Sequence, residues 1–266
     1  MITFLTNQPL WLSGLIIVGL TTVVAMSGPG LVRRYVALER LTTNNEIAGF
    51  KFATVGVLYA VFLAFAVIVV WEKFADADST VAKEAGAAAS IYHLSHGIDD
   101  TQGAALRAAL TIYLKSATTE EWQTMESGQA SKSTLKALEG IYAALVAAQS
   151  HEQSNSALMS EIFYQLDVLT QARRARLTAA EGAVPGIVWL VLFGGAALTI
   201  AFTLFFGTLN LRAQTMMTGL LSILIFSELL IIVAIDKPFT GTLTVGPGAL
   251  TDVLADFGSQ PPAHGL

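Results

Sequence analysis

Aromatic, aliphatic and acidic residues recur every three to four positions over residues 55–76 of this sequence. The apolar members of this stripe are Val55, Leu58, Phe62, Phe65 and Val69, and its acidic members are Glu72 and Asp76. The spacing keeps these side chains on one face of a long helix. If several copies of that helix surround an axis, the stripe predicts a pore constricted by its apolar members from Leu58 to Val69. Its carboxylates would then form an acidic mouth, which favours cations in channels.

Each part of this stripe also has a structural alternative. The apolar residues are typical of helix–helix packing within one subunit, and Phe62 and Phe65 could face lipid instead of closing a pore by dewetting. Glu72 and Asp76 could lie on a solvated face with Lys73 as an ion-pair partner. The sequence leaves both interpretations open.

A lone carboxylate, Glu228, lies near the middle of the apolar segment 215–235. A charge inside a membrane costs a few kcal/mol or more, so this group must face protein or water, or be protonated. The functional interpretation is a proton- or cation-responsive site in a conduction path. The structural alternative is a neutral carboxyl group that hydrogen-bonds to Ser227, Tyr59 or a backbone carbonyl.

The same segment is followed by the run Asp236, Lys237, Pro238 and Phe239. We expect this motif to fix the exit of the chain from the membrane, through an ion pair or by capping a helix end. A ligand-binding role for Asp236 is the alternative.

Metal, catalytic and nucleic-acid sites are not predicted. His93 and His96 could share one helix face, but the helix is expected to end at Gly97 and no further ligand follows. The chain has no cysteine, phosphate-binding loop, dinucleotide fingerprint, zinc-protease motif or nucleophile elbow. Its formal net charge of −5 does not favour nucleic-acid binding. We therefore expect neither enzyme activity nor a cofactor.

The composition indicates that membrane helices position these residues. Of 266 residues, 53% are hydrophobic and 13% are charged, and the charged share is about half that of a soluble domain. Residues 10–32, 47–71, 184–207 and 215–235 form four apolar segments, each near or above the roughly 20 residues that span a bilayer. Gly28-Pro29-Gly30 is expected to kink or end the first segment, and Asn44 or Asn45 to cap the second.

A polar block, residues 72–183, separates the second and third apolar segments. Its apolar residues recur at helical spacing, so we expect it to be helical. The second span should continue to Gly97, with further helices over 101–117, 133–148 and 155–180 and loops over 118–131 and 149–154. The predicted inward faces carry Leu106, Leu110, Tyr113 and Leu114 in the helix 101–117, and Leu135, Leu138, Tyr142, Leu145 and Val146 in the helix 133–148.

The predicted fold class is all-α, with four transmembrane helices in two pairs and a polar helical domain inserted between the second and third. The predicted boundaries are 1–71 for the first transmembrane pair, 72–183 for the helical extramembrane domain, 184–239 for the second pair and 240–266 for the C-terminal tail. The tail includes a short amphipathic piece with Leu250, Val253, Leu254 and Phe257, and residues 258–266 are expected to be disordered.

Basic residues suggest the orientation in the membrane. The short links between paired spans carry Arg33, Arg34, Arg40, Lys51 and Arg212, and the opposite side carries Lys73, Lys83, Arg173, Arg174, Arg176 and Lys237. The positive-inside rule weighs short loops most heavily. It therefore predicts cytoplasmic links and an extracytoplasmic inserted domain.

Two features of the polar block have no role in this scheme. Arg173, Arg174 and Arg176 could contact lipid headgroups, as basic segments near membranes do, or more simply pair with acidic residues of the domain. Trp122 is expected to pack a loop onto the helices.

Several motifs follow one another along the chain. The second span contains Gly49-Phe50-Lys51-Phe52, the run from Gly56 to Phe65, and Val70-Trp71-Glu72. The polar block adds Glu84-Ala85, Tyr113, Glu121-Trp122, Arg173 and Arg176, and the later spans add Pro185, Trp189, Gly194-Gly195 and the run from Asp236 to Gly241. In this order and at these spacings, the motifs resemble those of the bestrophin-like domain proteins, a family of bacterial membrane proteins. The resemblance covers about residues 45–248 and leaves the first span largely outside.

The resemblance implies a remote similarity to the bestrophins, which are pentameric ion channels lined by their second transmembrane helix, with apolar aromatic residues at the neck. Phe62 and Phe65 would be the matching neck residues here. The sequence has no clear counterpart of the bestrophins' acidic calcium-binding clasp. In bestrophins the domain and both termini are cytoplasmic, which opposes the charge pattern. We follow the charge pattern, because it comes from this sequence.

We therefore expect a homo-oligomeric ion channel or pore with a cation preference, lined by the second span, in the bacterial inner membrane. Its expected partners are other copies of the chain, membrane lipids and inorganic ions. One alternative is a non-conducting membrane-anchored module whose polar domain senses or docks another protein. Another is a small transporter, which is less favoured because no internal repeat joins the span pairs and no broken helix pair is predicted.

Overall fold

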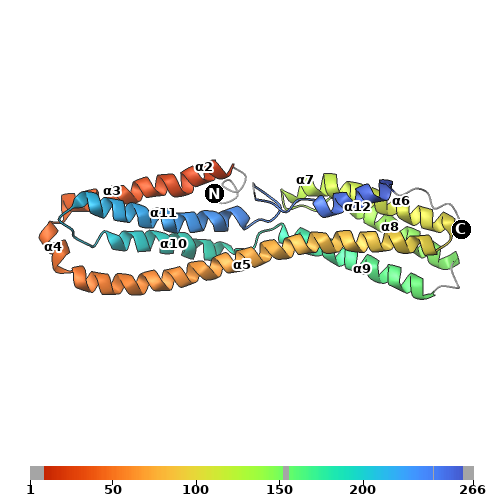
Figure 1. Ribbon diagram of the computed structural model, residues 1–266, viewed down its shortest axis with the longest axis horizontal. Helices are drawn as coiled ribbons and strands as arrows, with labels where there is room; N and C mark the ends of the chain where they lie inside the picture. Colours follow the sequence, from red (N-terminus) through yellow and green to blue (C-terminus); the bar gives the residue numbers. More distant parts are fainter. Residues whose placement is uncertain (1–8, 152–155, 242, 260–266) are drawn as a thin grey trace. The chain divides into compact units, whose positions relative to one another are not determined.

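The computed structural model describes residues 9–151, 156–241 and 243–259, and within these ranges every regular element is a helix (Figure 1). Helices α2 to α5 are Leu10–Gly14, Thr21–Tyr35, Leu38–Thr43 and Asn45–Leu94, with a π-helical stretch at Leu15–Leu20 and a 3-10 turn at Ser95–Gly97. Helices α6 to α9 are Asp100–Ser116, Trp122–Met125, Lys132–His151 and Ser156–Ala179, with a second π-helical stretch at Ala117–Glu121. Helices α10 to α12 are Gly186–Thr203, Leu211–Ile235 and Gly248–Ser259.

The chain divides into two compact units. The first unit comprises Met1–Glu72, Ala183–Lys237 and Gly241–Leu243, and the second comprises Lys73–Gly182, Pro238–Thr240 and Thr244–Leu266. The boundary between them falls inside α5, between Glu72 and Lys73. The amphipathic helix α12 therefore belongs to the second unit. The disorder expected for residues 258–266 is wrong for Gly258 and Ser259, which end α12, and residues 260–266 lie outside the described residues.

All four candidate membrane-spanning helices start in the first unit. Four helical stretches are long and apolar enough to cross a bilayer, namely Leu10–Tyr35, Asn45–Gly97, Gly186–Thr203 and Leu211–Ile235. In the most apolar 18-residue part of each stretch, 50% of the residues of α11 are buried, whereas only 17% of those of α5 are buried. The helix α11, which packs on α2, α3 and α10, is thus the centre of this bundle, and α5 is its most exposed member.

The first span differs from expectation at its C-terminal end. The helix does not end at Gly28-Pro29-Gly30 but continues through Pro29 to Tyr35. A short helix that the sequence analysis did not predict, α4, then follows, and its Leu41 is buried.

One seam of α5 is buried along most of the length of the helix. The seam consists of residues seven apart, each at most 4% exposed: Leu63, Val70, Ala77, Glu84 and Ile91. A repeat of seven residues returns to nearly the same side of a helix, so α5 presents one continuous face to the rest of the chain. The aliphatic character of this seam changes only at Glu84.

In the second unit, α6 and α8 pack along each other, and α9 and α12 complete the core. The predicted inward face of α6 is confirmed, since Leu106, Leu110, Tyr113 and Leu114 are all fully buried. The predicted face of α8 is partly wrong. Its buried residues are Leu138, Ile141, Leu145 and Ala148, whereas Leu135, Tyr142 and Val146 are exposed. The predicted face of α8 was too wide. Alanines lie beside the larger apolar residues and fit either the core or the surface, so the apolar pattern does not fix which side of the helix faces inward.

The expected loop 118–131 is largely helical. The chain leaves α6 through the π-helical stretch Ala117–Glu121 and continues into α7. Glu121 in this segment is fully buried and bonds to Arg173 and Arg176 of α9. A buried carboxylate must be paired, so these bonds fix a segment that apolar periodicity alone does not reveal.

Two arginines and two glutamates form a charge-balanced network in the core of the second unit. Arg176 donates from Nε and Nη2 to the carboxylate of Glu84, at 2.7 and 2.9 Å, and from Nη2 to Glu121, at 2.9 Å. Arg173 donates to both oxygens of Glu121, at 3.0 and 2.5 Å. The ion-pairing expectation is thus confirmed for Arg173 and Arg176, which are too buried to meet lipid headgroups, while Arg174 is exposed.

Neighbouring groups complete this charge network. The Tyr113 hydroxyl donates to Glu84 at 2.6 Å, and the Arg176 guanidinium lies 5.0 Å from the ring centre of Trp122. Burial lowers the pKa of Arg176, but the charges and hydrogen bonds of its partners outweigh this and hold the pKa above its usual value. Burial, followed by the charge of Glu84, raises the pKa of Tyr113 well above its usual value. The tyrosine therefore stays a neutral donor and the arginine stays charged.

Replacing Arg176 should destabilise the second unit far more than replacing its exposed neighbour. Arg176→Ala leaves the buried carboxylate of Glu84 without an ion-pair partner, which typically costs about 3–5 kcal/mol. Arg174→Ala is the matched control and should change the free energy of unfolding by no more than about 0.5 kcal/mol. Unfolding of the purified protein in detergent, followed by circular dichroism, measures both. Equal destabilisation by the two variants would contradict a structural role for the network.

Candidate functional site

The predicted stripe lies beside the buried seam of α5. Phe62 and Val69 immediately precede the seam residues Leu63 and Val70, so they point about 100° away from the seam around the helix axis, and Leu58 stands in the same relation to the buried Tyr59. The side chains of Leu58, Phe65 and Val69 are 68%, 64% and 48% exposed, and Phe62 is half-buried. The bundle of a single subunit therefore does not fill the space in front of the stripe.

The acidic members of the stripe continue this exposed face. Glu72 and Asp76 are both exposed, and neither forms an ion pair within the described part of the chain. Lys73 is thus not their ion-pair partner, while their exposure agrees with the solvated face of the structural alternative as well as with a pore mouth. Their charges remain available to ions or to another subunit.

Aromatic and polar contacts with α10 hold α5 in the first unit. The Tyr59 hydroxyl donates to the carbonyl of Leu192 at 2.8 Å. Gly195 allows this approach, since a Cβ there would lie 2.5 Å from the Tyr59 ring. Phe52 packs edge-on against Phe206, with ring centres 5.7 Å apart. These contacts turn the seam toward α10 and leave the stripe outside.

The start of α5 is fixed by an unpredicted clamp. The Asn45 side chain donates to the carbonyl of Gly207 at 2.8 Å and accepts from its amide at 3.0 Å. Gly207 must be small, because a Cβ there would lie 2.8 Å from the backbone nitrogen of Thr42. The Asn45 side chain thus hydrogen-bonds to the backbone of the link after α10 instead of capping its own helix.

Glu228 is half-buried on α11 and lies close enough to Tyr59 for an electrostatic interaction. Its carboxyl group has no hydrogen bond or ion pair to any described residue, and the Tyr59 hydroxyl is already bonded to Leu192. Neither Ser227 nor Tyr59 hydrogen-bonds to this carboxyl group among the described residues, and both interpretations of Glu228 stay predictions.

A polar ladder along α11 was missed by the sequence analysis. Gln214, Thr218 and Ser222 are buried at intervals of four residues, and Ser222 accepts a hydrogen bond from Thr22 at 3.3 Å. The signal was present as polar residues four apart in an apolar span. It was overlooked because none of these residues carries a charge.

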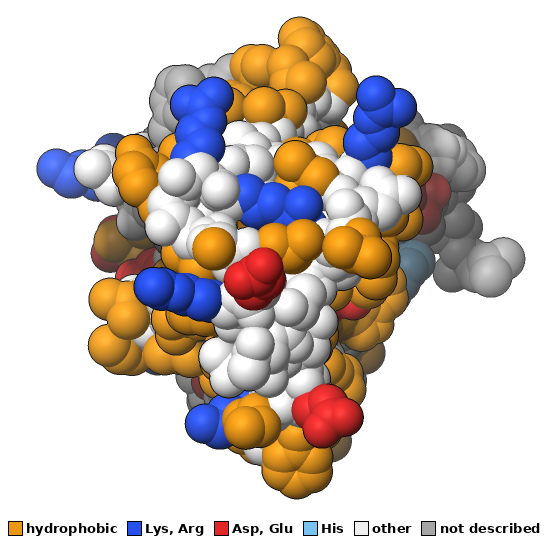
Figure 2. Space-filling view, turned by 90° about the vertical axis from the view of Figure 1, so that its left-hand side faces the viewer, with side chains coloured by type: hydrophobic (Ala, Val, Ile, Leu, Met, Phe, Trp, Pro, Cys, Tyr) orange, Lys and Arg blue, Asp and Glu red, His pale blue; other side chains and the backbone are white. Residues whose placement is uncertain are grey.

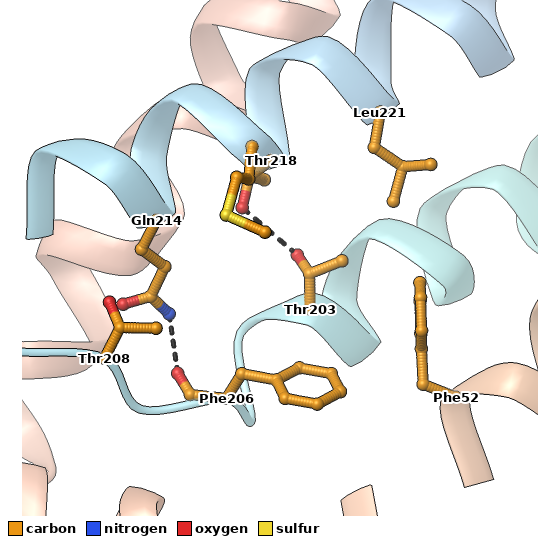
Figure 3. Close-up of a pocket in the computed structure, with 8 residues that line it drawn as sticks. Phe52, Thr203, Phe206, Thr208, Gln214, Thr218 and Leu221 are labelled. Carbon is orange, nitrogen blue, oxygen red and sulfur yellow. Dashed lines mark hydrogen bonds between the residues drawn. The ribbon is translucent and has the colours of Figure 1, made fainter. Parts of the chain in front are cut away.

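Two ladder residues, Gln214 and Thr218, border an apolar cavity of about 360 Å³ between α5, α10 and α11 (Figure 3). Gln214 donates to the Phe206 carbonyl at 2.6 Å, and Thr203 and Thr218 share a hydrogen bond of 3.4 Å. These polar groups hydrogen-bond within the protein, and no charged side chain lines the cavity. The cavity suits an apolar occupant and provides no group for chemistry.

Asp236 of the exit motif binds the backbone of the segment that leads into α10. Asp236 Oδ1 accepts from the amides of Ala183 and Val184 at 3.1 and 2.8 Å. Burial raises the pKa of the Asp236 carboxyl, and these donors with Lys237 offset this only in part, so the pKa stays above its usual value. Asp236 therefore acts through capping, and its bonds leave no sign of a ligand site.

The other half of the motif belongs to the second unit. Pro238 and Phe239 are buried, and the carbonyl of Pro238 accepts from Val245 at 2.7 Å. Phe239 packs edge-on against Trp122, with ring centres 5.6 Å apart. Trp122, which also covers Arg176, thus packs into the core from a helix and not from the predicted loop.

The histidine pair has the setting expected of ordinary side chains. His93 is exposed, and His96 Nδ1 lies 3.1 Å from the Tyr92 carbonyl. No group of three or more acidic, histidine or cysteine residues capable of holding a metal occurs in the described part of the chain.

The chain belongs to the Bestrophin-like domain family, which matches residues 19–250. The match corrects the predicted extent, because it includes most of the first span. It confirms the family suggested by the motifs. No curated protein sequence is significantly similar to this chain.

Solved structures share this fold at low sequence identity. A mutant of a bacterial bestrophin homologue from Klebsiella pneumoniae is 12% identical, with a TM-score of 0.72 over 90% of this chain and 98% of that one. Another crystal structure of a bestrophin homologue from Klebsiella pneumoniae is 16% identical, with a TM-score of 0.69 over 91% and 98% of the two chains. At such identities the likeness establishes the fold and not the roles of individual residues.

The effect of Asp236 on stability should depend on pH. A carboxyl group with a raised folded-state pKa binds a proton more readily in the folded chain, so its contribution to stability falls as pH rises through that pKa. Asp236→Asn keeps the acceptor oxygen and should gain stability relative to the wild type from acid to neutral pH. Asp236→Ala removes the acceptor and should lose about 0.5–2 kcal/mol in the free energy of unfolding. Thermal unfolding from pH 4 to 8 tests this, and a pH-independent difference between Asn and wild type would contradict it.

Proposed function

We propose that this chain is one subunit of a homo-oligomeric ion channel lined by the stripe of α5. One observation carries the proposal: the stripe lies outside its own subunit's bundle, while the adjacent seam is buried. Bestrophin homologues are oligomeric ion channels, so membership of the family supports a channel at a coarse level. Copies arranged around an axis would bring the exposed stripes to face one another.

The stripe supplies two physical barriers in such an assembly. Rings of Leu58, Phe62, Phe65 and Val69 would exclude water when narrow and pass hydrated ions when wide, as apolar constrictions do. Glu72 and Asp76 would add a ring of negative charge at one mouth, which raises the local concentration of cations. We therefore propose a preference for cations.

The topology of the proposal follows the predicted domains. Residues 1–71 and 184–239 would hold the paired spans, residues 72–183 the inserted domain, and residues 240–266 the tail. The excess of arginine and lysine in the short links supports cytoplasmic links and an extracytoplasmic domain in a bacterial inner membrane. Conduction along such a path needs no cofactor.

Ion flux through liposomes tests conduction and the role of the stripe together. The purified full chain should dissipate a cation gradient, and Phe62→Ala should increase the flux by widening an apolar constriction. Glu72→Gln with Asp76→Asn should lower the cation-to-anion permeability ratio about fivefold, because a unit charge at close range in water is worth about 1 kcal/mol.

Leu190→Ala, at an exposed position on α10, is the matched control and should leave flux and selectivity unchanged. Absence of flux from properly assembled wild-type protein would favour the non-conducting module. Saturable exchange of a solute against a driving ion would favour the small transporter.

Glu228 is proposed as a proton- or cation-responsive group beside the conduction path. Its half-buried carboxyl group forms no hydrogen bond or ion pair with the described residues, so its protonation should alter the local field directly. Glu228→Gln should flatten the dependence of liposome flux on pH, because the amide cannot bind or release a proton. Unchanged flux and unchanged pH dependence would reduce Glu228 to a structural residue.

A further inference from the structure

A groove of about 410 Å³ lies in the first unit, between the α4–α5 corner and the C-terminal end of α10. One wall is apolar and includes Ile47, Phe202 and Phe205. Ile47 and Phe205 are each 62% exposed. The volume is within the range of pockets that bind small ligands, about 300–1,000 Å³.

Two cations stand at this apolar wall. Arg40 and Lys51 line the groove and are exposed, and neither forms an ion pair with any residue that the structure describes. In this respect the groove differs from the cavity in Figure 3, which has no charged lining and whose polar groups are bonded to one another.

The charge of the surrounding surface has the same sign. The links at this end of the first unit contain Arg33, Arg34, Arg40, Lys51 and Arg212 but only Glu39 and Glu46 as acidic residues. Figure 2 views the end of the molecule that carries α4 and shows Lys and Arg side chains distributed among hydrophobic ones. The local excess of positive charge favours an anionic occupant.

With α5 and α10 crossing a bilayer, the groove would lie where headgroups give way to acyl chains. It is formed at one end of two membrane-spanning helices, with Lys51 about 9 Å along α5 from Asn45 and Phe205 just beyond the end of α10. Aromatic residues and long basic side chains are favoured at this level, because their apolar parts contact acyl chains while their polar ends reach the headgroups.

We propose that this groove is a binding site for an anionic phospholipid. The phosphate lies between Arg40 and Lys51, and an acyl chain covers Ile47, Phe202 and Phe205. A free phosphate would satisfy the cations but leave the apolar wall exposed, and a neutral lipid would cover the wall but leave the cations unpaired. Basic pockets between membrane helices bind anionic headgroups by the same combination of forces.

The site would join parts of the chain that already meet next to it. Arg40 and Lys51 flank the start of α5, where Asn45 clamps Gly207, and Phe202 and Phe205 belong to the end of α10. A bound lipid would therefore bridge α5 to α10 and stabilise the folded subunit by mass action. This inference does not depend on ion conduction.

Binding of phosphatidylglycerol and phosphatidylcholine to the purified full chain in detergent tests the proposal, with native mass spectrometry as the readout. The wild type should retain phosphatidylglycerol in preference to phosphatidylcholine. Arg40→Gln with Lys51→Gln should weaken retention about 25-fold, since each basic residue near an anionic surface contributes about fivefold. Arg34→Gln with Arg212→Gln removes the same charge from exposed positions outside the groove and should change retention less than about twofold.

A third variant separates the apolar contribution from charge. Ile47→Ser with Phe205→Ser should weaken retention of phosphatidylglycerol without altering net charge, and soluble glycerol phosphate should fail to compete. Equal losses in both glutamine variants would indicate general attraction to a basic surface and overturn the proposal. Competition by glycerol phosphate, or a change in oligomeric state with unchanged lipid retention, would also overturn it, in favour of a free phosphate or a second copy of the chain.

Discussion

Burial of a single face of α5 is the constraint from which the functional account follows. Residues seven apart, from Leu63 to Ile91, are enclosed by the rest of the chain, whichever unit they belong to. A helix with one face fixed in this way has no freedom to turn its neighbouring face inward. The stripe with Phe62, Phe65 and Glu72 is therefore left for lipid, water or another subunit. The contact of Tyr59 with Leu192 and Gly195 sets this rotation inside the first unit.

The charge network of the second unit explains why the family motifs are scattered along the sequence. Glu84, Tyr113, Glu121 and Arg176 come from separate helices and meet in one buried cluster, which Trp122 covers. A core of this kind gives little net stability over an apolar one, but it strongly penalises any arrangement that leaves one member unpaired. The network thus selects a single register among α5, α6, the π-helical stretch Ala117–Glu121 and α9. The same motif residues look unrelated in sequence because charge pairing, unlike apolar periodicity, has no fixed spacing.

Apolar length and helical periodicity predicted the all-helical fold, the four candidate spans and most helix ends in the polar block. They failed where competing interactions decide local structure. Periodicity misassigned the face of α8, since alanine fits both the core and the surface. It placed residues 118–125 in a loop, because the pairing of Glu121 with two distant arginines is a tertiary effect. Residue type and spacing singled out the stripe and Glu228, and the four-residue spacing of Gln214, Thr218 and Ser222 was also readable, but the Asn45 clamp became visible only when the helices were placed together.

The accessibility of the α5 stripe to water in the assembled protein tests the central claim most directly. The sequence contains no cysteine, so a single cysteine at each chosen position can be labelled without background. Flux through liposomes would be recorded before and after a charged, membrane-impermeant thiol reagent is added to Phe62→Cys, Val69→Cys and the exposed α10 control Leu198→Cys. The account predicts that the reagent blocks flux through both stripe variants and leaves the control unaffected. Stripe cysteines that remain unmodified while ions still pass, or block at the control alone, would contradict it.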